Sequence, residues 1–422
     1  MASMFRAWVA LVIAVCLQGC ATTVLTASCD NPKVSNRSIP FIYLVMLPYV
    51  YRGDSAPSEM HRSAVAALND VARLQVVRMG AEASDMHVTL LQDGGKGCEI
   101  EMVHKAFTQK RLLKAQLLST VVFYWGEVFE AEDRMIVQSH VRVLWKNPND
   151  DVVSFETLLP RSDTRLRFNG MVPYSTVSFP PRDLPIGDEV GGGRLRMLLE
   201  ARSGTMRGAE AVPLPKSFLI NQRVGNWVEL RDRETQTSSW VAVTDPGSNA
   251  KSLLPELSFA QALAAYASYS TAPNDSVAAN SIRWLDEFRA AYPSTGGEAQ
   301  RQSMAVADLI EAVLRLARNA GEADQLRAAE LMDKAVAALP ANSAALNLAG
   351  ISRIERCCST RQDAAEVQRR LDLARQLDVG NEVIAKNLLN WYRLLERKDV
   401  AVQPYDREEM RRRAEELAGA LR

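Results

Sequence analysis

The chain is short of histidine and carries no excess of charge. Only 4 of its 422 residues are histidine, and 50 Lys and Arg residues balance 50 Asp and Glu residues. A neutral chain has no net field that would attract nucleic acid, so we expect no nucleic-acid partner. All four histidines lie within the first 140 residues. A cysteine hydrolase in the C-terminal third is therefore excluded, because that third has no histidine to act as the base.

Recognisable catalytic and metal-binding motifs are also missing. The sequence contains no G-x-S-x-G, no H-E-x-x-H and no zinc-type cysteine spacing. The glycines at 191–193 lack the Lys-Ser/Thr of a phosphate-binding loop, which predicts a linker. Cys98 and His104 lie close in sequence, and a structural role accounts for either. We therefore expect no enzymatic activity, no cofactor and no metal site.

Long hydrophobic runs are absent after the N-terminus, where none approaches the about 18 residues of a membrane span. Residues 1–19 carry Arg6 and then the apolar run AWVALVIAVCL, the layout of a cleaved export signal. The segment Leu17-Gln18-Gly19-Cys20 resembles the lipobox of bacterial lipoproteins, with Gln18 in place of the usual small residue. The resemblance implies acyl chains on Cys20, a linker over 20–37, and anchoring to the membrane through Cys20.

The same resemblance implies a subcellular location. Ala21 and Thr22 lack the Asp that, in that lipoprotein family, retains proteins at the inner membrane. We therefore expect an outer-membrane lipoprotein that faces the periplasm. The alternative is cleavage by an ordinary signal peptidase, which leaves Cys20 free or removes it.

Few cysteines remain for a disulfide in the mature chain. In an oxidising periplasm Cys29 and Cys98 are the candidates for a bridge, and spacing alone leaves their pairing open. Cys357 and Cys358 are adjacent, so we expect two thiols at a helix end rather than a bridge between them.

Residues 38–182 have the mixed pattern of an α/β or α+β domain. The run FIYLVMLPYVY predicts a buried strand, and the segment after Pro57 predicts a helix. Further strands are expected at LQVVRM and MHVTLL, followed by a hairpin that turns at 131–133. The pair Leu47-Pro48 and the later Gly126-Glu127-Val128 resemble N-terminal domains of several envelope proteins, which implies only the fold.

Residues 187–245 contain short β-runs separated by polar turns, which predict a small β-barrel. The segments GNWVEL and SSWVAV resemble the last strands of bacterial SH3-like domains, with Ser239 at a position where Gly is usual. Trp227 and Trp240 then either pack in the barrel core or line a groove that binds a peptidoglycan peptide.

Residues 256–422 change to a helical period rich in Ala, Leu, Arg and Glu. The segment AVAALPANSAALNLAG is echoed by ARQLDVGNEVIAKNLL, in which Leu377 aligns with Leu339 and Ile384 with Leu346. This repeat resembles degenerate tetratricopeptide repeats, which implies stacked helix pairs that bind a protein partner. The alternative is a helical bundle without a binding surface.

Two functional hypotheses follow. In the first, a membrane-anchored envelope lipoprotein assembles a protein complex through its helical repeats, with envelope proteins as partners. In the second, the SH3-like segment binds peptidoglycan and the repeats are only structural.

Overall fold

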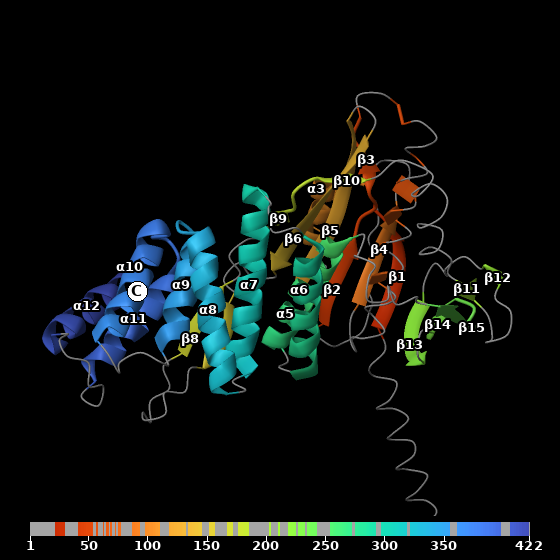
Figure 1. Cartoon of the computed structure of the whole chain (residues 1–422). Coiled ribbons are helices and arrows are strands. Elements are labelled where there is room, and N and C mark those ends of the chain that lie inside the picture. Colours follow the sequence, from red (N-terminus) through yellow and green to blue (C-terminus); the bar gives the residue numbers. More distant parts are fainter. Residues whose placement is uncertain are drawn as a thin grey trace, which may run out of the picture. The chain divides into compact units, whose positions relative to one another are not determined.

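The computed structural model of the chain consists of two compact units, each with its own internal contacts (Figure 1). The sheet unit comprises residues 1–146, 178–264 and 287–293, and the helical unit comprises residues 147–177, 265–286 and 294–422. The structure describes residues 22–29, 41–53, ten positions between 56 and 76, 87–92, 98–109, 118–131, 134–145, 152–156, 167–171, 176–184, 202–203, 210–211, 218–224, 227–232, 234–242, 254–271, 275–292, 297–318, 321–354, 361–397 and 406–421.

Four neighbouring parallel strands form the middle of the sheet unit, in the order β5-β2-β4-β1. They are β1 (Thr22–Ser28), β2 (Phe41–Met46), β4 (His87–Gln92) and β5 (Leu118–Ala131). Parallel neighbours require crossover connections, which helices usually supply. Between β4 and β5 the chain forms α3 (Ile100–Gln109), and between β2 and β4 it passes through helical positions from 62 to 76.

The first crossover corrects one prediction. Leu68, Ala72 and Val76 are buried at the i, i+4 spacing of one helix face. Gln75 and Val76 are accordingly helical, whereas LQVVRM was predicted as a strand. The Gln75 side chain donates to the Leu254 carbonyl, 3.1 Å away, and to Ser258 Oγ, 3.2 Å away. These bonds place this helix against the start of α5 (Pro255–Thr271).

Strand β1 corrects a second prediction. Residues 20–37 were expected to form a linker, but residues 22–28 form a strand inside the sheet, between β4 and β13 (Phe218–Val224). From Thr23 to Ser28, β1 pairs with β4 in parallel. The segment TTVLTAS is rich in β-branched and apolar residues, which suits a covered strand better than a linker.

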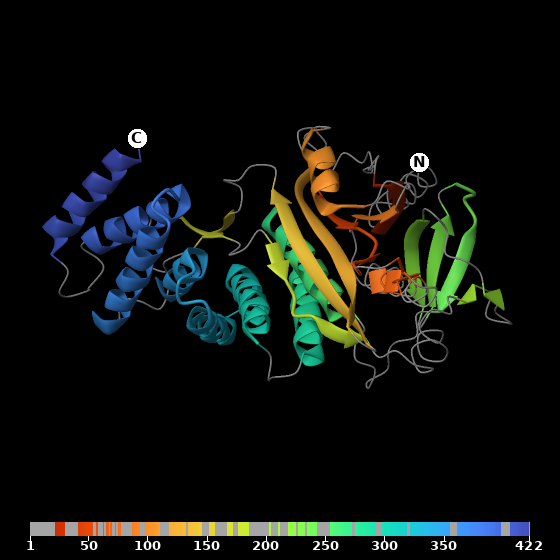
Figure 2. The same ribbon diagram turned by 90° about the horizontal axis from the view of Figure 1, so that it is seen from above.

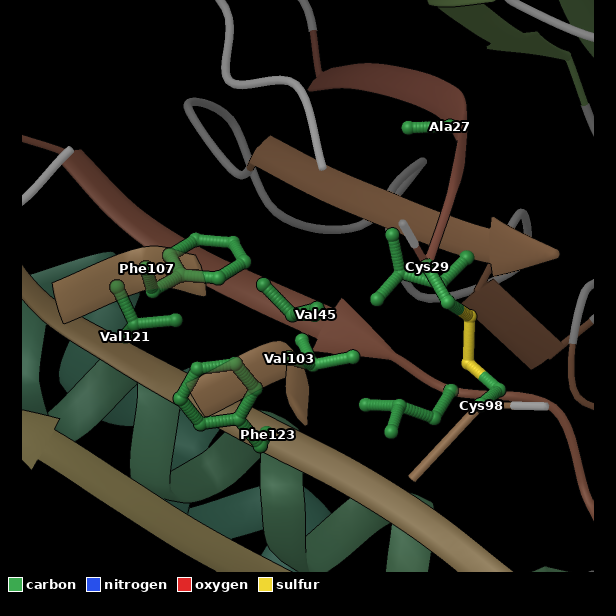
Figure 3. Packing of buried hydrophobic residues seen from close by; sticks show 10 residues of the cluster. Ala27, Cys29, Val45, Cys98, Val103, Phe107, Val121 and Phe123 are labelled. Carbon is green, nitrogen blue, oxygen red and sulfur yellow. A yellow bond between two sulfur atoms is a disulfide. The ribbon is translucent and has the colours of Figure 1, made fainter. Parts of the chain in front are cut away.

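One face of the sheet packs against α3. Val103 and Phe107 of α3 contact Val45 of β2 and Phe123 of β5 in a buried cluster (Figure 3). Figure 3 also shows the disulfide between Cys29 and Cys98 beside this cluster. The Cα atoms of the two cysteines are 5.5 Å apart, and the bridge ties the end of β1 to the residue pair before α3.

The opposite face is covered by the first part of α5 and the last part of α6 (Asp275–Ala291). Phe179 and Phe259 meet edge to face at 5.2 Å between ring centroids, and Phe288 completes an aromatic cluster. Figure 2 shows α3 and α5 on opposite faces of the sheet. The sheet unit is therefore covered by helix on both faces, as expected for parallel strands.

The predicted hairpin is confirmed in the strands β5 and β6 (Arg134–Trp145), which pair from Thr120 with Trp145 to Ala131 with Arg134. Val137, Ser139, Val141 and Val143 are buried on β6, while the residues between them are partly exposed. Strands β3 (Val50–Tyr51), β9 (Thr176–Ser178) and β10 (Arg182–Leu184) extend this side of the sheet.

The strands from the segment predicted as a small barrel continue the same sheet. They are β11 (Arg202–Ser203), β12 (Glu210–Ala211), β13, β14 (Trp227–Asp232) and β15 (Ser238–Ala242), in the order β13-β14-β15-β11-β12. Strand β13 also pairs antiparallel with β1, from Thr22 with Ile220 to Val24 with Phe218. These strands thus share one sheet with the N-terminal strands, which the sequence did not predict.

The helical unit contains α7 (Glu298–Arg318), α8 (Glu322–Ala338), α9 (Ser343–Ile354), α10 (Arg361–Leu377), α11 (Glu382–Glu396) and α12 (Arg407–Ala420). It also contains a two-stranded hairpin, β7 (Val152–Glu156) with β8 (Arg167–Met171). Residues 38–182 were predicted as one domain, but 147–177 group with the helices because the hairpin contacts them. The chain therefore has a mainly β N-terminal region followed by an all-helical C-terminal region. This order of a sheet-containing region and a helical region agrees with the prediction from the sequence.

Candidate protein-binding surface of the helical unit

The helices of this unit associate in consecutive pairs. Helix α7 contacts α8, α9 contacts α10, and α11 contacts α12. Successive pairs also meet, because α8 and α7 both contact α9, and α10 and α9 both contact α11. Helices α7, α9 and α11 are thus the first members of their pairs, and they follow one another through the unit.

Asparagine side chains cap the first helices of the last two pairs. The Asn342 side chain accepts from the Ala345 N–H at 2.8 Å, and the Asn381 side chain accepts from the N–H groups of Val383 and Ile384. Both caps stand immediately before the first helix of a pair. The alignment of Leu339 with Leu377 is wrong in detail, because Leu339 is buried whereas Leu377 is 46% exposed. The capping asparagines are the equivalent residues.

Two of the first helices, α7 and α9, have middle turns in which every residue is buried. All residues from 344 to 352 of α9 are buried, as are all residues from 305 to 314 of α7. In contrast, α8 buries one stripe, which consists of Ala328, Ala329, Leu331, Met332 and Ala335. A helix with one covered face shows such a stripe, whereas full burial requires neighbours all round. These two helices therefore have a further neighbour besides their own second helices.

The β7–β8 hairpin supplies that neighbour. Strand β8 contacts α9 and α11, and β7 contacts α7. Figure 2 shows the yellow strands beside these helices. We call the surface of α7, α9 and α11 that the hairpin contacts the inner face. The hairpin was not predicted from the sequence, although VVSFE has the residue types of a strand; RFNGM, with Asn and Gly, does not.

An ion-pair network joins α8, α9 and α10. Asp333 of α8 accepts from Arg353 of α9 at 2.5 Å and from Arg370 of α10 at 2.7 Å. Arg370, only 7% exposed, also donates to Glu366 at 2.6 Å. Hydrogen bonds from Arg369 and Arg370 lower the pKa of Glu366 to about 2, so this carboxylate is ionised at neutral pH. The network fixes the second helices relative to α9.

Polar side chains also join the last two pairs. The Trp391 indole of α11 donates to Gln368 Oε1 of α10 at 2.7 Å, and the Tyr392 hydroxyl donates to Asp372 Oδ1 at 3.2 Å. Met410 and Ala414 are the buried residues of α12, whose remaining face carries i, i+4 pairs such as Arg413 with Glu409. This charged face suits a helix that ends the stack.

The predicted site residues outside the helical unit have three outcomes. Cys20 lies outside the described residues. Cys29 and Cys98, whose pairing the sequence left open, form a disulfide. Trp227 pairs with Ala242 and Trp240 pairs with Glu229, so both tryptophans stand on one face of the β14–β15 pair. That face is opposite to the face of the fully buried Leu230.

Two polar features of the sheet unit carry little reactive potential. The hydroxyl of Tyr49 lies 2.6 Å from that of Tyr124 and 2.8 Å from Ser139 Oγ, in a buried network. Burial raises the pKa of Tyr124 well above its ordinary value, so the phenol keeps its proton. On the other face His140 stacks on Trp125, with ring centroids 5.1 Å apart. Desolvation lowers the pKa of His140, which is therefore neutral at pH 7.

A cavity of about 310 Å³ lies at the carboxyl ends of β2 and β4. Its lining includes Leu47, Pro48, Asn69, Leu91 and Gln92. The Tyr49 N–H donates to Asn69 Oδ1 at 2.7 Å, which fixes the chain after Pro48 against the helix that carries Asn69. The position is one where α/β proteins commonly bind ligands, but the described lining residues offer two amides and no charged group.

Searches against known proteins found no match of any kind. No family model, no curated protein and no solved structure matches the chain. Among the described residues, no helix is long and apolar enough to span a bilayer. Within the same residues, no group of three or more His, Cys, Asp or Glu side chains is placed to hold a metal ion.

Proposed function

We propose that this protein is a non-enzymatic envelope lipoprotein that assembles a protein complex through its helical unit. The observation that carries the proposal is the succession of helix pairs, in which α7, α9 and α11 each contact the β7–β8 hairpin. Such pairs resemble tetratricopeptide repeats, whose stacking creates extended surfaces for polypeptide partners. The ion pairs around Asp333 support the proposal, since a rigid surface loses less entropy on binding.

The anchor is part of the same proposal. Acyl chains on Cys20 would hold the protein at the outer membrane with both units in the periplasm. The Cys29–Cys98 disulfide supports an oxidising compartment, because such bonds persist there and are rare in the cytosol. Replacement of Cys20 by Ala should abolish acyl labelling and release the protein from membranes, which fractionation of labelled cells measures.

Crosslinking in the native cells tests the scaffold function. Partners recovered with the full chain should be absent when residues 298–422 are removed, while acyl labelling at Cys20 stays unchanged. A second form that lacks only residues 406–422 is the control, because it retains α7, α9 and α11, the helices that contact the hairpin. Partner recovery that is independent of residues 298–422 would contradict the proposed function.

Peptidoglycan binding by the SH3-like segment is the second candidate. The register supports it, because Trp227 and Trp240 share one face of the β14–β15 pair and one ligand can contact both. If this candidate is right, Trp227→Ala and Trp240→Ala should each abolish binding to isolated sacculi while the thermal unfolding midpoint stays the same. A large drop in the midpoint would instead place the indoles in the core.

A further inference from the structure

The inner face of the helical unit already has an occupant. Every residue from 344 to 352 of α9 is buried, and β8 contacts both α9 and α11. Strand β7 contacts α7, so the hairpin meets the first helix of each pair. An extended polypeptide thus lies on the surface to which the proposed function assigns the partner.

The occupant depends on the helices for its own stability. Strands β7 and β8 pair from Val152 with Met171 to Glu156 with Arg167 and, among the described residues, pair with no other strand. An isolated two-stranded hairpin is marginal in water, so packing against helices is what stabilises it. Local elements open at a lower free-energy cost than the global core, and among the described residues this hairpin has no strand partner outside itself.

The occupant is also covalently tethered. The chain leaves the sheet after β6, which ends at Trp145, and returns to it at β9, which begins at Thr176. The hairpin lies between these two points. Strand β9 pairs with β6, so the two ends of the excursion are held near each other. A tethered ligand has a high effective concentration, on the order of millimolar for short linkers. A free segment must overcome this advantage to take its place.

We propose that the β7–β8 hairpin is a resident ligand of the inner face, and that the partner binds there as an extended segment that displaces the hairpin. The inference rests on the proposed function, because it specifies which surface meets the partner and in what form. The buried residues of α7 and α9 are mostly Ala, Val, Leu and Ile, so the partner segment presents apolar side chains to them.

A peptide supplied in trans tests the occupancy. The probe is a fluorescent synthetic peptide with the sequence of residues 150–173, and the protein is the full chain with residues 152–171 replaced by a Gly-Ser linker of equal length. Fluorescence anisotropy should show saturable binding to this variant and at least about tenfold weaker binding to the wild-type chain. A scrambled peptide of the same composition is the control. Equal binding to both proteins, or binding to neither, would overturn the proposal.

Folding of the linker variant is checked by its helical circular dichroism. If the replacement unfolds the helices, Asn169→Pro in β8 is the second variant, because proline removes a donor at the central Ser154–Asn169 pair and weakens the hairpin without deleting it. This variant should also gain peptide binding relative to the wild type. No gain in a folded Asn169→Pro protein counts against the proposal.

The same variants separate this inference from the proposed function. In the crosslinking experiment, partner recovery that requires residues 298–422 and rises several-fold in the linker variant supports both. Recovery that requires residues 298–422 but stays equal or falls in the linker variant keeps the scaffold function and rejects displacement. Recovery that never depends on residues 298–422 rejects the scaffold function. The anisotropy measurement with the 150–173 peptide then tests by itself whether the hairpin occupies the inner face.

Discussion

The side chain of Asn387 donates a hydrogen bond to Oδ1 of Asn347, 2.8 Å away, and both residues are fully buried. Asn347 belongs to α9 and Asn387 to α11, so the bond joins the first helices of two successive pairs. A buried amide is costly without a partner, and this pair therefore stabilises one relative position of the two helices.

Removal of this acceptor should destabilise the helical unit. We expect Asn347→Ala to lower the free energy of unfolding by about 1–3 kcal/mol, because the Asn387 amide loses its bond in a buried position. The double variant Asn347→Leu, Asn387→Leu should cost less than the sum of the two single changes. Urea denaturation followed by helical circular dichroism measures both. Lys386→Ala, at an exposed position of α11, is the control and should change the value by at most about 1 kcal/mol.

Acid should weaken the helical unit through Glu366. Its pKa is about 2 in the folded protein, below the ordinary carboxyl value of 4.5, so its contribution is fully present above about pH 4.5. The contribution is lost as the pH falls from there towards 2, and it amounts to at most ~3 kcal/mol. Glu366→Gln should therefore flatten the fall in unfolding free energy between about pH 4.5 and about pH 2.

The matched control for the acid experiment is Glu382→Gln. Glu382 pairs with Lys386 at 2.9 Å, but both side chains are more than half exposed. Exposed pairs contribute little, so this variant should keep the acid profile of the wild type. If Glu366→Gln and Glu382→Gln gave the same profile, the ion-pair network would not be the source of the acid sensitivity.

The buried ring of Tyr49 lies so close to Gly126 that no side chain fits at this position. A Cβ atom at this position would lie 1.9 Å from Cε1 of Tyr49, whose ring is buried and held by hydrogen bonds to Tyr124 and Ser139. We expect Gly126→Ala to cost about 1–3 kcal/mol in unfolding free energy, because the ring cannot move away freely. Gly419→Ala in α12 meets no atom within 4 Å and should be neutral or stabilising by up to about 1 kcal/mol.

Reduction should destabilise the sheet unit selectively. The Cys29–Cys98 bridge closes a loop with a sequence separation of 69, worth ~4 kcal/mol in the chain-entropy model. We expect dithiothreitol to lower the thermal midpoint of the sheet unit and leave the helical transition unchanged. The variant Cys29→Ala, Cys98→Ala should start at the lower midpoint and show no response to the reductant. A dithiothreitol response in that variant would assign the effect to other cysteines.

The sequence predicts best those elements whose residues alternate or repeat over many positions. The β5–β6 hairpin and its turn follow from alternation over a long segment, and the C-terminal helices follow from their period. The segment LQVVRM illustrates the opposite case, because six residues rich in apolar side chains fit a strand or a helix equally. Its helical state depends on Gln75 bonding to the start of α5, far away in sequence.

Long-range pairing accounts for what the sequence did not reveal. Nothing local to TTVLTAS indicates that β1 pairs with β4 and β13. The hairpin at 152–171 was likewise assigned to the domain that surrounds it in sequence, since only contacts with α7, α9 and α11 reveal its membership. The helical character of the C-terminal region could be predicted, but the positions at which α9 and α11 begin follow the caps Asn342 and Asn381 rather than the leucines that align by eye.

The position of β1 has a mechanical consequence if Cys20 carries the acyl chains. Only Ala21 separates that cysteine from Thr22, where β1 begins, so the chain between anchor and sheet can span at most about 7 Å. Any pull from the membrane is then borne by a strand hydrogen-bonded on both sides rather than by a slack tether. Because β1 runs parallel to β4 and β2, the bilayer meets the amino ends of these strands.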